Sequence, residues 1–145
     1  MSDDLYQQAI LEAARRGAEN RRLDRPDGSS TVDNPLCGDR VTMDVCVRDG
    51  RIAAVGFRTR GCALCQASTA LLADAAVSRE PGTLARAEDE VVAMLGHDGP
   101  PPAPPFDTYA MFMPARRHPS RHTCVRLPFD ALRQVLADAT DGGSS

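Results

Sequence analysis

The chain has 145 residues, of which 42% are hydrophobic and 4% aromatic, and its formal net charge is -3. This length is typical of one domain that buries a core of its own without disulfide support. The negative net charge and the absence of tryptophan disfavour nucleic-acid binding, because that function draws on basic surface and on aromatic rings that stack against bases.

Five cysteines, an odd number, argue against a full set of structural disulfides. No basic and apolar leader precedes the first acidic residues, and no apolar run is long enough to span a bilayer. We therefore expect a cytoplasmic protein that does not associate with membranes. In a reducing compartment, spaced cysteines are more often metal ligands or reactive thiols than bridges.

The first half of the chain predicts a helix followed by a hairpin. Residues 3–16 have apolar side chains every three to four positions and arginines near the end, as in an amphipathic helix. Residues 18–31 are polar and contain proline and glycine, so we expect a surface connection, with the core resuming near Val32. Apolar and polar residues then alternate over residues 40–58, on both sides of a tight turn at residues 49–50, which predicts two antiparallel strands.

The second half is predicted to be mainly helical. Two helices rich in alanine and leucine are expected over residues 63–78 and 84–95. Residues 96–105 form a proline-rich insert that cannot continue a helix. The apolar stretch 106–113 is of uncertain type, and a last helix begins near Pro128, because proline is tolerated in a first turn.

The last residues, 140–145, are expected to be a disordered tail. Together these elements predict an α+β fold in which a small antiparallel β-sheet is covered by helices.

Three short segments carry thiols and one carboxylate, at Cys37 and Asp39, at Cys62 and at Cys124. Each cysteine lies beside a glycine, after a tight turn or before a predicted helix. Three thiolates and a carboxylate complete a four-ligand site of a kind that suits zinc or iron–sulfur chemistry. The hard carboxylate beside soft thiolates makes a weaker, exchangeable bond to the metal, which indicates that the site exchanges metal or sulfur and is not merely structural.

Cys62 and Cys124 have different predicted environments. Cys62 follows a strand and starts a helix, so backbone N–H groups and the helix dipole favour its thiolate. Cys124 is flanked by Arg121 and Arg126, and we expect their positive charge to favour its ionised form. Cys124 is therefore the best candidate for a sulfur acceptor.

The three segments resemble, in the same order, motifs of the U-type iron–sulfur cluster assembly proteins, the family of IscU, SufU and the N-terminal domain of NifU. Residues 34–39, Asn-Pro-Leu-Cys-Gly-Asp, resemble its NP-x-CGD motif. Residues 61–68 resemble GCAIS-x-AS, and residues 119–124 resemble P-A-R-x-K-C. The resemblance covers most of the chain and implies a SufE/NifU-like (IscU-like) fold for a single domain of residues 1–145.

Within that family the chain is most similar to SufU, because a long interval with a proline-rich insert separates Cys62 from Cys124. Thr123 stands where IscU has histidine and SufU has lysine, and no Leu-Pro-Pro-Val-Lys motif for the Hsc chaperones is present. The resemblance implies a zinc ion held by Cys37, Asp39, Cys62 and Cys124. It also implies a SufS-type cysteine desulfurase as sulfur donor, and apo iron–sulfur proteins or a SufBCD-type scaffold as recipients.

The implied mechanism is zinc-dependent sulfur transfer, a sulfurtransferase-type accessory role. Zinc holds Cys124 as a thiolate, and docking of the desulfurase releases Cys124 to attack the persulfide of the enzyme. Three alternatives stay open. The same residues can hold a transient [2Fe–2S] cluster in a non-enzymatic scaffold, the metal can be a purely structural zinc, or Cys62 and Cys65 can form a redox pair, although no βαβ unit surrounds them.

Other residues with metal-binding or reactive groups have simpler interpretations. Cys65 is expected to pack inside its helix, with a role as spare ligand or persulfide relay as the alternative. Cys46 is expected to be inert or half-exposed, and His118 and His122 to be surface residues of a basic loop; His97 belongs to the insert. The neighbouring arginines are either a solvated edge or a docking patch; they are Arg116, Arg117, Arg121 and Arg126.

Overall fold

The structure, a computed structural model, describes residues 2–35 and 38–143. In chain order its elements are α1 (Ser2–Ala18), β1 (Gly28–Asn34), β2 (Asp39–Arg48), β3 (Arg51–Arg60), α2 (Ala63–Ala76), α3 (Pro81–Gly96), the 3-10 helix η1 (Phe106–Arg117) and α4 (Pro119–Gly143).

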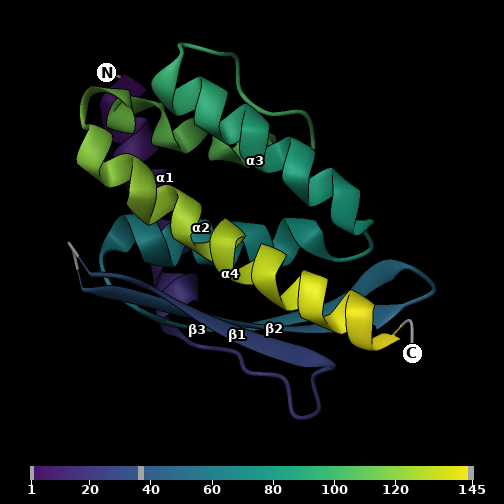
Figure 1. Cartoon of the computed structure of the whole chain (residues 1–145). Helices are drawn as coiled ribbons and strands as arrows, with labels where there is room; N and C mark the ends of the chain where they lie inside the picture. Colours follow the sequence, from purple (N-terminus) through teal and green to yellow (C-terminus); the bar gives the residue numbers. More distant parts are fainter. Residues whose placement is uncertain (1, 36–37, 144–145) are drawn as a thin grey trace.

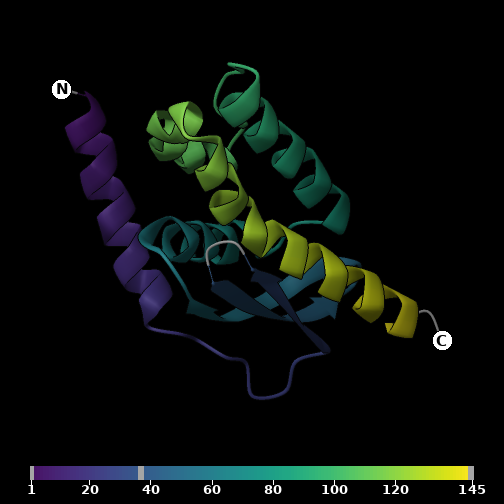
Figure 2. The same ribbon diagram turned by 60° about the vertical axis from the view of Figure 1, so that its left-hand side comes forward.

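The described elements form layers on one side of a three-stranded antiparallel sheet with the order β1-β2-β3. Helices α2 and α4 lie directly on the sheet, and α3 and η1 form an outer layer above them (Figure 1). Helix α1 stands beside α2, as the turned view shows (Figure 2). The predicted α+β fold is confirmed.

The predicted hairpin is also confirmed, as β2 and β3. Asp49 and Gly50 connect the strands with positive φ angles of 54° and 76°, the backbone that matches the twist of a two-residue hairpin. Val41, Met43 and Val45 point to the helices and are each 0% exposed. The alternation seen in the sequence therefore sets which face of the sheet enters the core.

Strand β1 differs from the prediction, because residues 28–31 of the expected surface connection belong to it. Gly28 pairs with Val45 and Asn34 with Asp39 in an antiparallel register. Residues 28–34 are mostly polar, so the sequence shows no alternation of apolar side chains that would predict a strand. Its stability comes from pairing with β2 and from packing against α4, where the Ser30 hydroxyl donates to the Gln134 side chain at 2.9 Å.

The remaining connection, residues 19–27, crosses the outer face of the sheet. The Arg21 N–H donates to the Phe57 carbonyl at 2.9 Å. A Cβ atom at Gly56 would lie 2.6 Å from the Arg21 carbonyl oxygen, so only glycine allows this crossing. The connection covers the outer face at Asp44 and Gly56, and the part nearer the start of β2 is open.

The helices of the second half follow the predicted order with shifted ends. Helix α3 begins at Pro81, because proline fits a first turn, and is longer than predicted. The proline-rich insert lies between α3 and η1, and the stretch of uncertain type is the beginning of η1.

The start and the end of the last helix were both predicted wrongly. Helix α4 begins at Pro119 and contains Pro128, because Val125 and Leu127 on its first turns are buried in the core and stabilise a helix there. The expected tail at residues 140–145 is helical as far as Gly143, since extending an existing helix costs little; residues 144–145 lie outside the described residues.

The connection is fixed by Asp44, which is 0% exposed on the outer face of β2. Its carboxylate accepts hydrogen bonds from the Arg22 guanidinium at 2.7 and 3.0 Å, from the Leu23 N–H at 3.0 Å and from the Ser29 hydroxyl at 2.5 Å. Burial alone would raise the pKa of Asp44, but these donors outweigh burial and lower it.

Replacement of this carboxylate by an amide, Asp44→Asn, should lower the free energy of unfolding by about 2–3 kcal/mol at pH 7, because buried donors lose a charged acceptor. A lowered folded-state pKa stabilises the fold above the unfolded pKa and stops doing so as pH falls through the folded value. Urea unfolding of both proteins should therefore show a difference that shrinks below about pH 4. A difference that is constant down to pH 2 would contradict the assignment of an ionised Asp44.

Candidate metal centre

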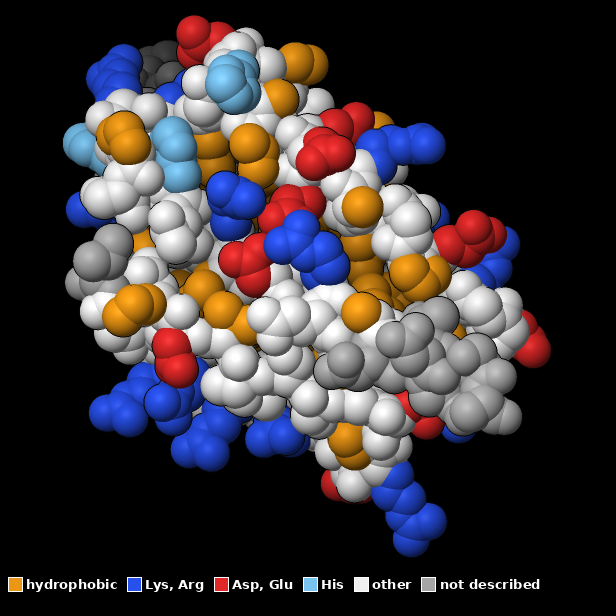
Figure 3. Space-filling model, viewed as in Figure 1, with side chains coloured by type: hydrophobic (Ala, Val, Ile, Leu, Met, Phe, Trp, Pro, Cys, Tyr) orange, Lys and Arg blue, Asp and Glu red, His pale blue; other side chains and the backbone are white. Residues whose placement is uncertain are grey.

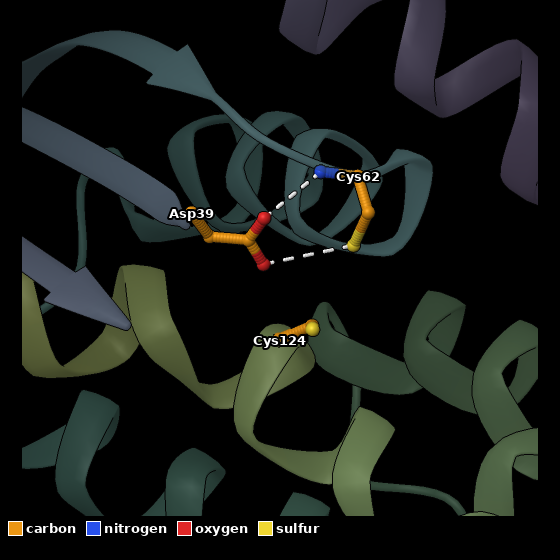
Figure 4. Close-up of side chains that lie close together, drawn as sticks. All are labelled: Asp39, Cys62 and Cys124. Carbon is orange, nitrogen blue, oxygen red and sulfur yellow. Dashed lines mark hydrogen bonds between the residues drawn. The ribbon is translucent and has the colours of Figure 1, made fainter. Parts of the chain in front are cut away.

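Three of the four predicted ligands meet at one end of the sheet. Asp39 begins β2, Cys62 precedes α2 and Cys124 lies near the start of α4. One donor atom from each lies within 4.8 Å of the other two (Figure 4). The fourth, Cys37, lies outside the described residues.

The Asp39 carboxylate is held in place by the start of α2. It is 2% exposed, and its Oδ1 accepts a hydrogen bond from the Cys62 N–H at 3.1 Å. Its Oδ2 lies 3.7 Å from the Cys62 sulfur. A Cβ atom at Gly61 would collide with Oδ1, so the glycine before Cys62 is required for this close approach.

Cys62 occupies the N-cap position of α2, as predicted, with an extended backbone (φ -73°, ψ 168°). Its side chain is exposed, whereas Asp39 and Cys124 are buried. The group is therefore reached from solvent on the side where Cys62 lies.

Cys124 is the buried thiol of the group, at 3% exposure. Burial raises the pKa of the Cys124 thiol well above its usual range, and Asp39 and Cys62 raise it further. The expectation that Arg121 and Arg126 favour its ionised form is wrong. Arg126 instead lies 3.7 Å from Glu88 of α3, and Arg121 is exposed along a groove beside α1.

The depth of Cys124 is set by a buried polar contact between α2, η1 and α4. The Ser68 hydroxyl donates to the Val125 carbonyl at 2.6 Å, and the Tyr109 hydroxyl donates to the Ser68 carbonyl at 2.8 Å. Ser68 belongs to the second motif of the sequence, but no pattern indicated that it positions the third cysteine.

The chain matches the family model for the NifU-like N terminal domain over residues 5–105. The chain belongs to this family. The resemblance found in the sequence is thereby confirmed.

Relatives of this NifU-like domain cover nearly its whole length. An iron–sulfur cluster assembly scaffold protein, IscU 1 of Archaeoglobus fulgidus, is 27% identical over 135 residues, which are 92% of this chain and 76% of the relative. The crystal structure of a NifU-like N-terminal protein from Brucella abortus has a TM-score of 0.85 and 32% identity, and 96% of each chain is covered. A SufU structure from Fervidobacterium islandicum AW-1 shares the fold, with a TM-score of 0.76, 20% identity and coverage of 88% and 93%.

Among the residues that the structure describes, no other cysteine and no histidine of this NifU-like domain belongs to the group of Asp39, Cys62 and Cys124. Cys65 is 0% exposed and packs in the core, as expected. Cys46 is half-buried, and its sulfur contacts the Arg25 carbonyl oxygen at 3.4 Å. His97 and His118 are exposed, and His122 contacts a backbone oxygen of η1.

The predicted basic run is not one surface. Arg116 donates to the Met94 and Gly99 carbonyl oxygens at 2.6 and 2.7 Å and so closes the end of α3. Arg126 faces Glu88, which leaves Arg117 and Arg121 at the groove beside α1. No helix in the described part of the domain has the length and apolar character needed to cross a membrane.

The unequal exposure of the two thiols predicts unequal reactivity. After removal of metal with a chelator, iodoacetamide should modify Cys62 at least about tenfold faster than Cys124, because access and thiolate content both limit the buried sulfur. Mass spectrometry with peptide fragmentation gives both rates. Denaturant serves as the control and should bring the two rates together. Equal rates in the folded protein would show that Cys124 is not buried.

Proposed function

We propose that this chain is an iron–sulfur cluster assembly protein, with a metal centre formed by Asp39, Cys62 and Cys124 and completed by Cys37. One observation carries the proposal: an anionic oxygen and two sulfur atoms from three separate elements lie within 4.8 Å of one another. The relatives with the same domain are named iron–sulfur cluster assembly scaffold proteins, which gives the class of function.

The donor set fits a thiophilic cation. Burial, Asp39 and Cys62 all raise the pKa of Cys124, so the three groups are costly to ionise together without a positive charge among them. Two sulfurs, one oxygen and a further cysteine would make the tetrahedral set that zinc accepts. When bound, zinc would stabilise the thiolates and protect them from oxidation.

Asp39 fits the role of an exchangeable ligand. Its Oδ1 accepts a hydrogen bond from the Cys62 N–H, so Oδ2, on the side of the Cys62 sulfur, is the atom that would hold the ion. A carboxylate oxygen is a harder donor than a thiolate and binds a soft ion less strongly. The side chain is held by the hydrogen bond from the Cys62 N–H, so it would keep its position on releasing the ion.

Cys124 is proposed to accept sulfur from a SufS-type cysteine desulfurase. Its thiolate attacks the terminal sulfur of the enzyme persulfide, one S–S bond forms as another breaks, and the donor thiolate leaves, so no oxidant is needed. Access requires movement of the first turns of α4. Pro128 lies inside α4 and cannot donate a backbone hydrogen bond, which lowers the cost of opening the helix at this point.

A second function is favoured by the exposure of Cys62. A cluster built as cargo on Asp39, Cys62 and Cys124 would have one ligand at the surface, from which a recipient protein can capture it. This is the scaffold function that the names of the relatives state. Zinc in the purified protein and stimulation of a desulfurase favour sulfur transfer, whereas a visible-absorbing cluster that moves to an apo protein favours the scaffold.

Removal of one carboxylate tests both functions against a purely structural zinc. Asp39→Ala should lower zinc affinity at least about tenfold and lower desulfurase stimulation or cluster transfer by a similar factor, because a ligand and its contact with Cys62 are both lost. Zinc competition assays and sulfide release measure the two effects. Asp89→Ala is the matched control, since Asp89 is an exposed carboxylate on α3, away from the sheet, and should leave both unchanged.

The outcomes separate the alternatives. Unchanged activity with a lower melting temperature for Asp39→Ala would mean that the metal is structural only. Equal effects of Asp39→Ala and Asp89→Ala would remove Asp39 from the centre.

A further inference from the structure

The outer face of the sheet is open at the end that carries the metal centre. Two rows of side chains cross the three strands there, Thr31, Thr42 and Arg58 in one and Asp33, Arg40 and Arg60 in the other. The connection from α1 covers only the next row, at Asp44 and Gly56. No described helix packs on these two open rows, which face solvent.

Except for Asp33, the residues of these rows line a hollow of about 330 Å³. Its walls are hydroxyl, amide and guanidinium groups, and the lining residues are Asn20, Arg22, Thr31, Arg40, Thr42, Arg58, Thr59 and Arg60. Basic side chains gather beneath the sheet at the lower left of the space-filling view (Figure 3). None of the lining residues is aromatic or acidic.

The hollow has an excess of positive charge. Arg22 pairs with Asp44 at 2.7 Å, and Arg40 pairs with Asp33 at 2.6 Å. Arg58 and Arg60 form no ion pair with any residue that the structure describes. Two exposed guanidinium groups are therefore available to an anion, although the chain as a whole has a net charge of -3.

The arrangement of the arginines suits an extended acidic segment. Arg58 and Arg60 are two positions apart on one face of a strand, which spaces their Cα atoms by roughly 6.8 Å. Carboxylates at alternate positions of an extended chain have the same spacing. Phosphate sites usually add backbone N–H groups or a helix N-terminus. At the outer edge of β3 the N–H groups of Phe57 and Thr59 already donate, to the Arg21 carbonyl and the Asn20 side chain.

The hollow and the metal centre share the ends of two strands. Arg40 follows Asp39 in β2, and Arg60 precedes Gly61 and Cys62. Because side chains alternate along a strand, Asp39 points to the helices and Arg40 points to the open face. A segment docked on the open face would thus be separated from the metal centre by the thickness of the sheet.

We infer that the open rows are a docking site for an extended acidic segment of a partner protein. The carboxylates of the segment bind Arg58 and Arg60, and the hydroxyls of Thr31 and Thr42, 2.8 Å apart, continue the row of Arg58 across the strands. Binding at this face needs no metal. Only the identity of the partner, as a sulfur donor or a recipient, rests on the proposed function.

The test uses the isotope-labelled full chain and a synthetic peptide of alternating glutamate and serine. In low-salt buffer, the peptide should shift the backbone NMR signals of Thr42, Arg58 and Arg60, and added salt should reverse the shifts. The double variant Arg58→Glu/Arg60→Glu should weaken binding at least about tenfold, because attraction becomes repulsion. The matched control, Arg15→Glu/Arg86→Glu, makes the same charge change at exposed sites on α1 and α3 and should stay within about twofold.

Three results would overturn the inference: equal affinities of the two double variants, peptide-induced shifts on another face, or tighter binding of pyrophosphate than of the peptide at this face. The last result would assign the hollow to a small phosphate ligand. If the reversed variant does not give the spectrum of a folded protein, Arg58→Gln/Arg60→Gln replaces it. The peptide experiment contains neither zinc nor a desulfurase, so a negative result would reject the docking site and leave the proposed function unaffected. A negative result in the zinc and desulfurase assays would likewise leave the docking site unaffected.

Discussion

The hydrogen bond from the Cys62 N–H to the Asp39 carboxylate is the contact on which the site depends. It joins the end of the sheet to the start of α2 and fixes one carboxylate oxygen while leaving the other beside the Cys62 sulfur. The missing side chain of Gly61 makes room for it, and burial of Asp39 strengthens it, because a charge-assisted hydrogen bond gains from low solvent exposure. A single carboxylate thus organises the hairpin end and the helix start together.

The contrast between the two described thiols follows from where their helices begin. Cys62 caps α2 at the edge of the core and is exposed. Cys124 lies inside the first turns of α4, which Ser68 and Tyr109 hold against the core. A site with one exposed and one buried sulfur can be approached from a single side, and it can keep a reactive atom covered until α4 moves. Both properties suit a protein that receives or passes on sulfur under control.

The hairpin and the position of Cys62 could be predicted from the sequence, because residues close together in the chain determine both. The alternation around Asp49 and Gly50 fixes the hairpin, and a cysteine between a strand and an alanine-rich helix must lie at the N-cap. Strand β1 and the true start of α4 were not predictable, because both depend on partners distant in the sequence: β2 for the polar strand, and the core for a helix that contains Pro128. The prediction that Arg126 favours the ionised form of Cys124 was wrong for the same reason, since its carboxylate partner Glu88 lies on α3.

Anomalous diffraction at the zinc absorption edge, from crystals of the zinc-loaded chain, would show whether Asp39, Cys62 and Cys124 bind one ion. We expect one peak at about 2.3 Å from the Cys62 and Cys124 sulfur atoms and about 2.0–2.2 Å from an Asp39 oxygen. A chain that binds no zinc would contradict a metal centre at this end of the sheet. So would a peak bonded to other residues, with no oxygen of Asp39 among its ligands.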